Sequence, residues 1–126
     1  MEEELRQLVA QCIKASGHNP LSQGALESFC AAHGLTRVGL FREYSRHVAQ
    51  EFSEGALAFW DGNRAMNQLG GAALEELEGF ALDVFHAFDH GEYLEAGDPA
   101  GTVPWQRYTL PEVMAALARE GLQPRT

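Results

Sequence analysis

Apolar residues recur along this chain at intervals of three and four positions, which is the period of an amphipathic α-helix. The first stripe consists of Leu5, Leu8, Val9, Cys12 and Ile13. Three glutamates precede it, in the first turn, where the helix dipole favours negative charge. Gly17 and Pro20 follow the stripe and predict the end of this helix.

Cap residues bound the next two predicted helices. Ser22 is typical of an N-cap and Gly34 of a helix end, so the segment between them is predicted to be a short second helix. Thr36 is placed to begin a third helix, which Gly55 closes. Its buried stripe is the most regular in the chain and consists of Leu40, Phe41, Tyr44, Val48 and Phe52.

Two further helices are expected between residues 61 and 90. Asp61 is a candidate N-cap for the first, and Gly70-Gly71 is predicted to break it. The alternative is a continuous helix through the pair, at a cost of about 1 kcal/mol per glycine. In that helix Asn67, one turn beyond Asn63, is a candidate buried polar residue. The second helix runs from about Leu74 to His90 and buries Leu77, Phe80, Ala81, Val84 and Phe88.

The last helix has a recognisable start signal, and a long connection precedes it. Thr109 followed by Glu112 matches the capping box, and Pro111 suits the first turn. Residues 92–108 contain two glycines and two prolines, which predicts a loop. Loops of this length are uncommon in compact domains and are often functional.

These elements together predict the fold class. Few alternating apolar and polar runs compete for strand assignment. At 126 residues, with 45% hydrophobic residues, the chain is long enough for one core without metal or disulfide support. We therefore expect an all-α protein, a compact bundle of five or six helices in a single domain (1–126), with one long loop before the last helix.

Charge and composition exclude several classes of function. The net charge of −9 disfavours nucleic acid and anionic membrane surfaces as partners, because both are bound through Lys and Arg. No apolar run is long enough to span a membrane, and the acidic N-terminus is unlike a signal peptide. We expect a cytoplasmic protein whose Cys12 and Cys30 are free thiols, with a Cys12–Cys30 bridge as the alternative.

The most informative charge feature is the absence of lysine and arginine between Arg64 and Arg107. Eight carboxylates fall in this stretch: Glu75, Glu76, Glu78, Asp83, Asp89, Glu92, Glu95 and Asp98. We interpret the 75–108 region as a surface that binds a basic protein partner, because complementary charge speeds encounter. Tyr93, Trp105 and Tyr108 would supply anchoring contacts. The alternative for these aromatics is a lid that packs the loop onto the core.

The basic residues include a small cluster in the third predicted helix. Arg37, Arg42 and Arg46 lie within ten positions, and Arg42 and Arg46 are opposite the apolar stripe. We expect them to pair with Glu43 and with acids of neighbouring helices, while the alternative is a bound anion.

One helix face could hold a divalent metal ion. Asp83, His86 and His90 are spaced by three and four residues, and His-x-x-x-His is a known metal-binding geometry. The three lie opposite the apolar stripe, so they would point to solvent unless another helix or subunit covers them. The glutamate base of the HExxH motif is missing.

No motif for enzymatic chemistry emerges elsewhere. The serines and cysteines lack the setting of a known nucleophile, and no phosphate-binding glycine loop is present. We therefore expect a non-catalytic protein without a cofactor that binds a basic partner. The alternatives are a metal-binding protein or metal-dependent enzyme using Asp83, His86 and His90, and a scaffold that forms a homo-oligomer.

Overall fold

The computed structural model describes residues 1–122, which form six α-helices and no strand. The helices are α1 (Glu2–Lys14), α2 (Gln23–His33), α3 (Arg37–Ser53), α4 (Phe59–Ala73), α5 (Gly79–His90) and α6 (Leu110–Arg119). A 3-10 turn, η1 (Leu74–Glu76), precedes α5, and a π-helical turn, η2 (Trp105–Thr109), leads into α6. The prediction of an all-α helical bundle is confirmed.

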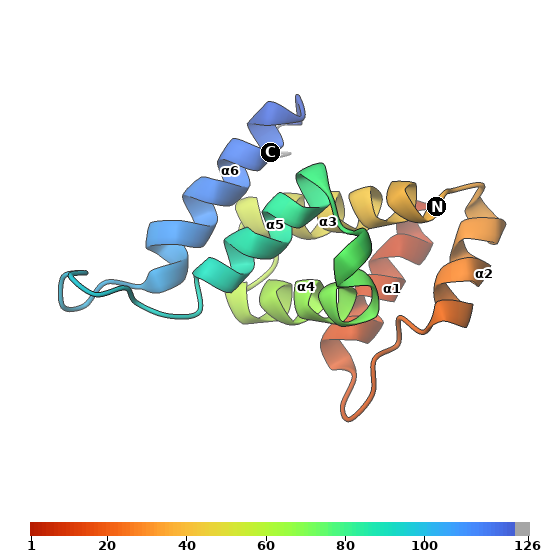
Figure 1. The fold of residues 1–126 in the computed structure, drawn as a ribbon, viewed down its shortest axis with the longest axis horizontal. Coiled ribbons are helices and arrows are strands. Elements are labelled where there is room, and N and C mark those ends of the chain that lie inside the picture. The colour runs from red at the N-terminus through yellow and green to blue at the C-terminus, as the bar shows by residue number, and fades with distance from the viewer. Residues whose placement is uncertain (123–126) are drawn as a thin grey trace.

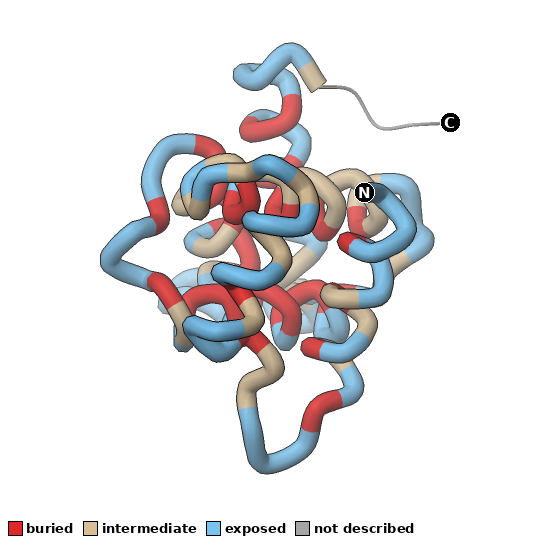
Figure 2. The backbone as a smooth tube through the Cα atoms, turned by 90° about the vertical axis from the view of Figure 1, so that its right-hand side faces the viewer, coloured by how far each residue is buried: buried red, intermediate tan, exposed pale blue. Residues whose placement is uncertain are grey.

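Helix α3 is the element around which the others are arranged. It contacts all five other helices of residues 1–122, while α5 also packs against α4, α6 and η2, and α1 also packs against α4. Along the longest axis of the molecule, α2 lies at one end and the segment 91–104 at the other (Figure 1). Buried positions gather in the middle of the bundle and the outer turns are exposed (Figure 2).

The predicted caps of α2 and α3 are confirmed. The Ser22 hydroxyl accepts a hydrogen bond from the Ala25 N–H at 3.1 Å, and Thr36 accepts from the Gly39 N–H at 3.0 Å. The apolar stripe predicted for α3 is buried throughout. Both cysteines are free thiols, as expected from the sequence, and burial raises the pKa of Cys12.

Helix α4 differs from the prediction at both ends. It begins at Phe59 with Ala58 as its N-cap, so Asp61 lies inside the first turn and is not the cap. It also continues through the Gly70-Gly71 pair to Ala73. The reason lies in packing, since a side chain on Gly70 would collide with the Phe85 ring of α5. The glycine lets the two helices approach, and this contact offsets its poor helix propensity.

The predicted helix from Leu74 to His90 is interrupted near its start. Residues 74–76 form η1, and α5 begins only at Gly79. Gly79 has a φ of +56°, a left-handed conformation that suits glycine and redirects the chain before α5. The five residues predicted to be the core stripe of this segment are nevertheless all buried.

The predicted capping box of the last helix is wrong. The chain is already helical in η2 before Thr109, which leaves this residue no N-cap geometry. The buried Thr109 hydroxyl instead donates to the Ala87 carbonyl of α5 at 2.7 Å. Gly91 lies directly against this contact, because a side chain there would overlap the Thr109 hydroxyl. The loop predicted over 92–108 correspondingly ends at Pro104.

Four aromatic side chains close the core beneath the segment 91–104. Phe52, at the end of α3, lies with its ring centroid 5.0 Å from Phe88 of α5 and 5.7 Å from Trp105 of η2. Phe59, at the start of α4, stacks on Phe88 and Trp105. These contacts join the ends of three helices to η2, and Trp105 covers this end of the core.

Candidate functional site

The eight carboxylates between Arg64 and Arg107 lie mainly at the two ends of α5. Glu75, Glu76 and Glu78 lie in η1 or just before α5, whereas Asp89, Glu92, Glu95 and Asp98 lie at its end or in segment 91–104. Asp83 is on α5 itself. Because α5 has 12 residues, about 1.5 Å each, roughly 18 Å of helix separates the two groups.

Basic residues from outside the stretch neutralise part of this charge. Arg37 of α3 makes a bidentate contact to Glu76, at 2.7 and 2.8 Å, and lowers the pKa of that carboxyl. Arg119 of α6 lies 3.2 Å from Asp83. The absence of Lys and Arg between Arg64 and Arg107 therefore does not leave all of these carboxylates without a basic neighbour in the fold. The carboxylates of the stretch that form no ion pair with residues 1–122 are Glu75, Glu78, Asp89 and Glu92.

His90 is held between two carboxylates that come from other elements. Its Nδ1 lies 2.6 Å from Glu112 Oε2 of α6, and its Nε2 lies 2.5 Å from Glu95 Oε1 of the loop. The imidazole ring also stacks on Tyr108, with centroids 4.2 Å apart. The hydrogen bond to Glu95, supported by Glu112, raises the pKa of His90 against the opposing effect of burial. Only the protonated ring donates through both nitrogens.

Asp98 anchors the far side of the same loop. Its Oδ2 accepts hydrogen bonds from the Glu95 N–H at 2.9 Å and from the Tyr108 hydroxyl, and its Oδ1 lies 2.9 Å from Arg107 Nε. The Tyr108 bond is the main cause of the lowered pKa of Asp98, and Asp98 in turn raises the pKa of Tyr108. The loop is thus fixed through side chains to α5 and η2, and its α5 partner His90 also contacts α6.

The first part of this loop, directly after α5, presents apolar side chains to solvent. Tyr93 is 74% exposed and Leu94 is 48% exposed. They follow Glu92 directly and lie four or five residues after Asp89, and neither of these two carboxylates has an ion-pair partner within residues 1–122. This end of the molecule therefore combines two adjacent exposed apolar side chains with two uncompensated carboxylates, whereas Leu74, 49% exposed, lies beside Glu75 at the other end of α5.

The three aromatics predicted as anchors have different surroundings. Tyr93 points outward, Trp105 is packed against Phe52 and Phe59, and Tyr108 lies against His90. Trp105 and Tyr108 thus support the loop from beneath, and the outward aromatic is Tyr93.

The residues of the metal hypothesis are engaged elsewhere or lie apart. Asp83 pairs with Arg119, His90 is held by Glu95 and Glu112, and His86 is exposed with its ring against Phe85. Within residues 1–122, no group of three His, Cys, Asp or Glu side chains is arranged to hold a metal ion. The metal-binding alternative has no geometric support in this part of the chain.

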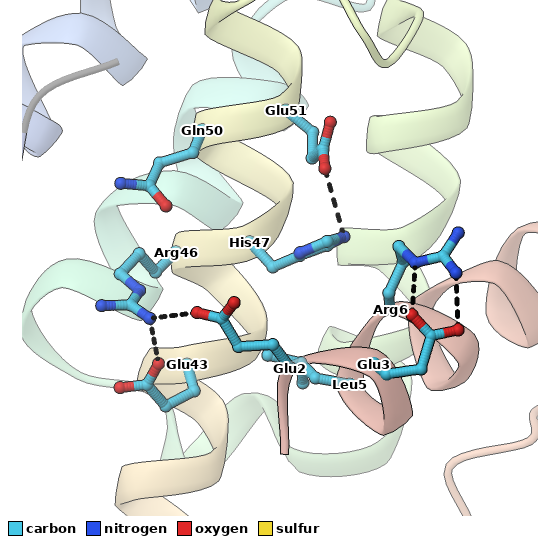
Figure 3. A pocket seen from close by; sticks show the side chains of 9 residues that line it. All are labelled: Glu2, Glu3, Leu5, Arg6, Glu43, Arg46, His47, Gln50 and Glu51. Atoms are coloured by element: carbon cyan, nitrogen blue, oxygen red, sulfur yellow. Dashed lines mark hydrogen bonds and ion pairs between the residues drawn. The ribbon is translucent and has the colours of Figure 1, made fainter. Parts of the chain in front are cut away.

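The arginines of α3 pair with carboxylates, as predicted. Arg42 lies 3.1 Å from Glu120, and Arg46 lies 2.9 Å from Glu43 and 3.8 Å from Glu2. A hollow of about 160 Å³ between α1 and α3 contains part of this network (Figure 3). Since its arginines already pair with carboxylates, and small-molecule sites typically measure about 300–1,000 Å³, this hollow is a poor ligand site.

Two residues of the site were missed by reasoning from the sequence. Leu94 carried a signal, because it is an apolar residue in an acidic loop next to Tyr93. Glu112 carried a misleading one, since its spacing from Thr109 matched a capping box. Its actual contact with His90, 22 positions away, depends on how α5 and α6 pack.

Comparisons with known proteins give no match to a protein-family model, to a curated protein or to a solved structure. Among the helices of residues 1–122, none combines the length and apolar character needed to cross a membrane.

Proposed function

We propose that this protein is a non-catalytic binding protein that docks a basic protein partner through the 89–108 part of its 75–108 region. The contact is centred on Asp89, Glu92, Tyr93 and Leu94. The observation that carries the proposal is the exposure of Tyr93 and Leu94 beside two carboxylates that have no ion-pair partner within residues 1–122. Protein interfaces commonly combine such an apolar centre with a polar rim.

Each part of this surface has a separate physical role in docking. Tyr93 offers a large amphipathic side chain, the type that often dominates binding energy. The carboxylates of Asp89 and Glu92 attract Lys and Arg side chains and disfavour acidic proteins. The contacts of Glu95 and Asp98 fix the loop in advance, which lowers the entropy lost on binding.

The proposal is tested by capture from an extract of the source cells with three baits, at low and at high salt. The baits are the native protein, Asp89→Lys/Glu92→Lys, and the control Glu75→Lys/Glu78→Lys. The two variants change the net charge equally, but at opposite ends of α5. We expect a basic protein that the native and control baits retain, that the Asp89/Glu92 variant loses, and that high salt releases.

The captured protein, once purified, allows the apolar contact to be measured directly. Truncation in Tyr93→Ala should weaken the affinity by about 10-fold or more in calorimetric titration. Equal capture by both double variants, or capture of acidic proteins alone, would contradict the proposal.

A further inference from the structure

A second hollow lies away from the docking loop, between the end of α1 and the outer face of α4. Its volume is about 770 Å³. This value falls within the range of about 300–1,000 Å³ that is typical of small-molecule sites. The residues of α4 that line it are Trp60, Asp61, Asn63, Arg64, Asn67 and Gln68, and His18 lines it from the α1–α2 connection.

Two of these residues build the wall of the hollow. The Arg64 guanidinium donates to the Ala15 carbonyl, and the Gln68 amide donates to the Cys12 carbonyl at 3.4 Å. Both carbonyls belong to the C-terminal turn of α1, where helix carbonyls lack intrahelical partners. These contacts tie the end of α1 to α4 along one side of the hollow.

Three polar side chains of α4 in the hollow keep unused hydrogen-bonding capacity within residues 1–122. Asn63 is 5% exposed, yet its Oδ1 accepts no hydrogen bond within residues 1–122. Asn67, expected from the sequence to be buried, is exposed, and like Asp61 it makes no side-chain hydrogen bond in this part of the chain. The Asn63 oxygen is shielded from the hollow, whereas the exposed Asp61 carboxylate and Asn67 amide can accept hydrogen bonds from a ligand that brings donors.

The rim of the hollow carries the most exposed tryptophan of the described chain. Trp60 is 62% exposed, whereas Trp105 is packed into the core. An exposed indole offers a flat apolar face and one N–H donor. It therefore suits a ring-shaped ligand that has an apolar face and polar edges.

The charges of the hollow indicate a neutral ligand. Asp61 and Arg64 carry opposite charges, and the other polar groups on α4 are amides. A phosphate or carboxylate would find one arginine that is already bound to a carbonyl. A ligand with hydroxyl groups matches these side chains better. A hydroxyl both donates and accepts hydrogen bonds, and the amides together with the Asp61 carboxylate also offer both donors and acceptors.

We propose that this hollow is a binding site for a small neutral saccharide, with one sugar ring stacked on Trp60 and its hydroxyls bonded to the exposed side chains of Asp61 and Asn67. This site is independent of the docking loop. The saccharide proposal and the docking proposal can therefore be refuted or supported separately.

The proposal is tested by saturation-transfer NMR and calorimetry on the full chain with a panel of probes. The panel contains glucose, galactose, N-acetylglucosamine and their β-linked disaccharides. It also contains adenosine, which joins a planar base to a sugar and therefore detects a site that prefers a nucleobase. We expect one saccharide to bind and Trp60→Ala to weaken it by about 10-fold or more, as truncation of an aromatic anchor does. Asn67→Ala should weaken it less, and because both residues are exposed these variants should fold.

The matched control is Tyr93→Ala, which removes another largely exposed aromatic, from the docking loop, and should leave saccharide affinity unchanged. Three outcomes overturn the proposal. They are no binding by any saccharide of the panel, saccharide binding that Trp60→Ala leaves intact, and binding of adenosine alone, which would assign the hollow to a nucleobase.

Discussion

At the scale of single residues, His90 joins parts of the chain that are distant in sequence. It lies on α5 and contacts Glu95 of the loop and Glu112 of α6, with Tyr108 against its ring. Asp98 and Arg107 pair with each other beside it, and His86 and Asp89 lie on its own helix. The imidazolium is thus the positive charge between two carboxylates, and its protonation affects how firmly the loop is held.

This arrangement predicts a pH dependence of stability. The folded-state pKa of His90 is raised, so its contribution is fully present below the unfolded pKa, about 6.5. It is lost as the pH rises through the folded-state pKa. Since the ring is partly exposed, we expect the loss to be about 1 kcal/mol or less. Urea unfolding over this pH range, with NMR titration of the His90 ring, measures it.

The control for this prediction is His86→Gln, which alters an exposed histidine one turn earlier on the same helix. It should keep the pH dependence of the native protein, whereas His90→Gln should flatten it. The explanation is wrong if His90→Gln retains the full dependence, or if the His90 ring titrates below its ordinary pKa.

At the scale of secondary-structure elements, glycines decide how closely α4 and α5 pack. A side chain at Gly62 would meet the Phe88 ring at 2.6 Å, and one at Gly70 would overlap the Phe85 ring. Both glycines lie on the face of α4 that α5 covers. The close approach of the two helices therefore depends on residues without a side chain.

The neighbouring glycines of α4 provide a direct test of this packing. In Gly71→Ala the new methyl meets Asn19 at an ordinary 3.4 Å, so we expect about 0.5–1 kcal/mol of added stability from helix propensity. In Gly70→Ala the same gain is opposed by overpacking, which costs about 1–3 kcal/mol. Gly70→Ala should therefore be the less stable variant in urea unfolding. Equal stabilities would mean that Phe85 moves aside without cost.

The helix boundaries show which signals a sequence carries by itself. The caps at Ser22 and Thr36 were predictable, because each bonds to a backbone N–H three residues later. Gly70 and Thr109 were not, because their roles depend on Phe85 and Ala87 of another helix. Local patterns predicted local contacts, and contacts between elements required the fold.

At the scale of the whole molecule, the candidate docking surface was only partly predictable. Composition predicted an acidic region, and the spacing of glycines and prolines predicted the loop that carries it. The pairing of Glu76 with Arg37 and of Asp83 with Arg119 depends on packing across 39 and 36 positions. This pairing left the uncompensated carboxylates in two small groups instead of one continuous face.

The aromatic cluster at the end of the core should make the bundle unfold as one unit. Phe88 contacts Phe52 and Phe59, which places three helices around one side chain. We expect Phe88→Ala to lower the free energy of unfolding by about 3–5 kcal/mol. Circular dichroism reports the helices, and tryptophan fluorescence reports the packed Trp105 together with the exposed Trp60, whose surroundings change less on unfolding. The two transitions should coincide, and separate transitions would show independent folding units.

The contact between Gly91 and Thr109 has a consequence for how this sequence can vary. Position 91 has no space for even a methyl group, because the Thr109 hydroxyl and the Trp105 backbone occupy it. A smaller residue without a hydroxyl at position 109 would make some room, but it would leave the Ala87 carbonyl without the hydrogen bond from Thr109. Natural variants of this protein should therefore keep both residues or exchange both together, and a lone change at either one should be rare.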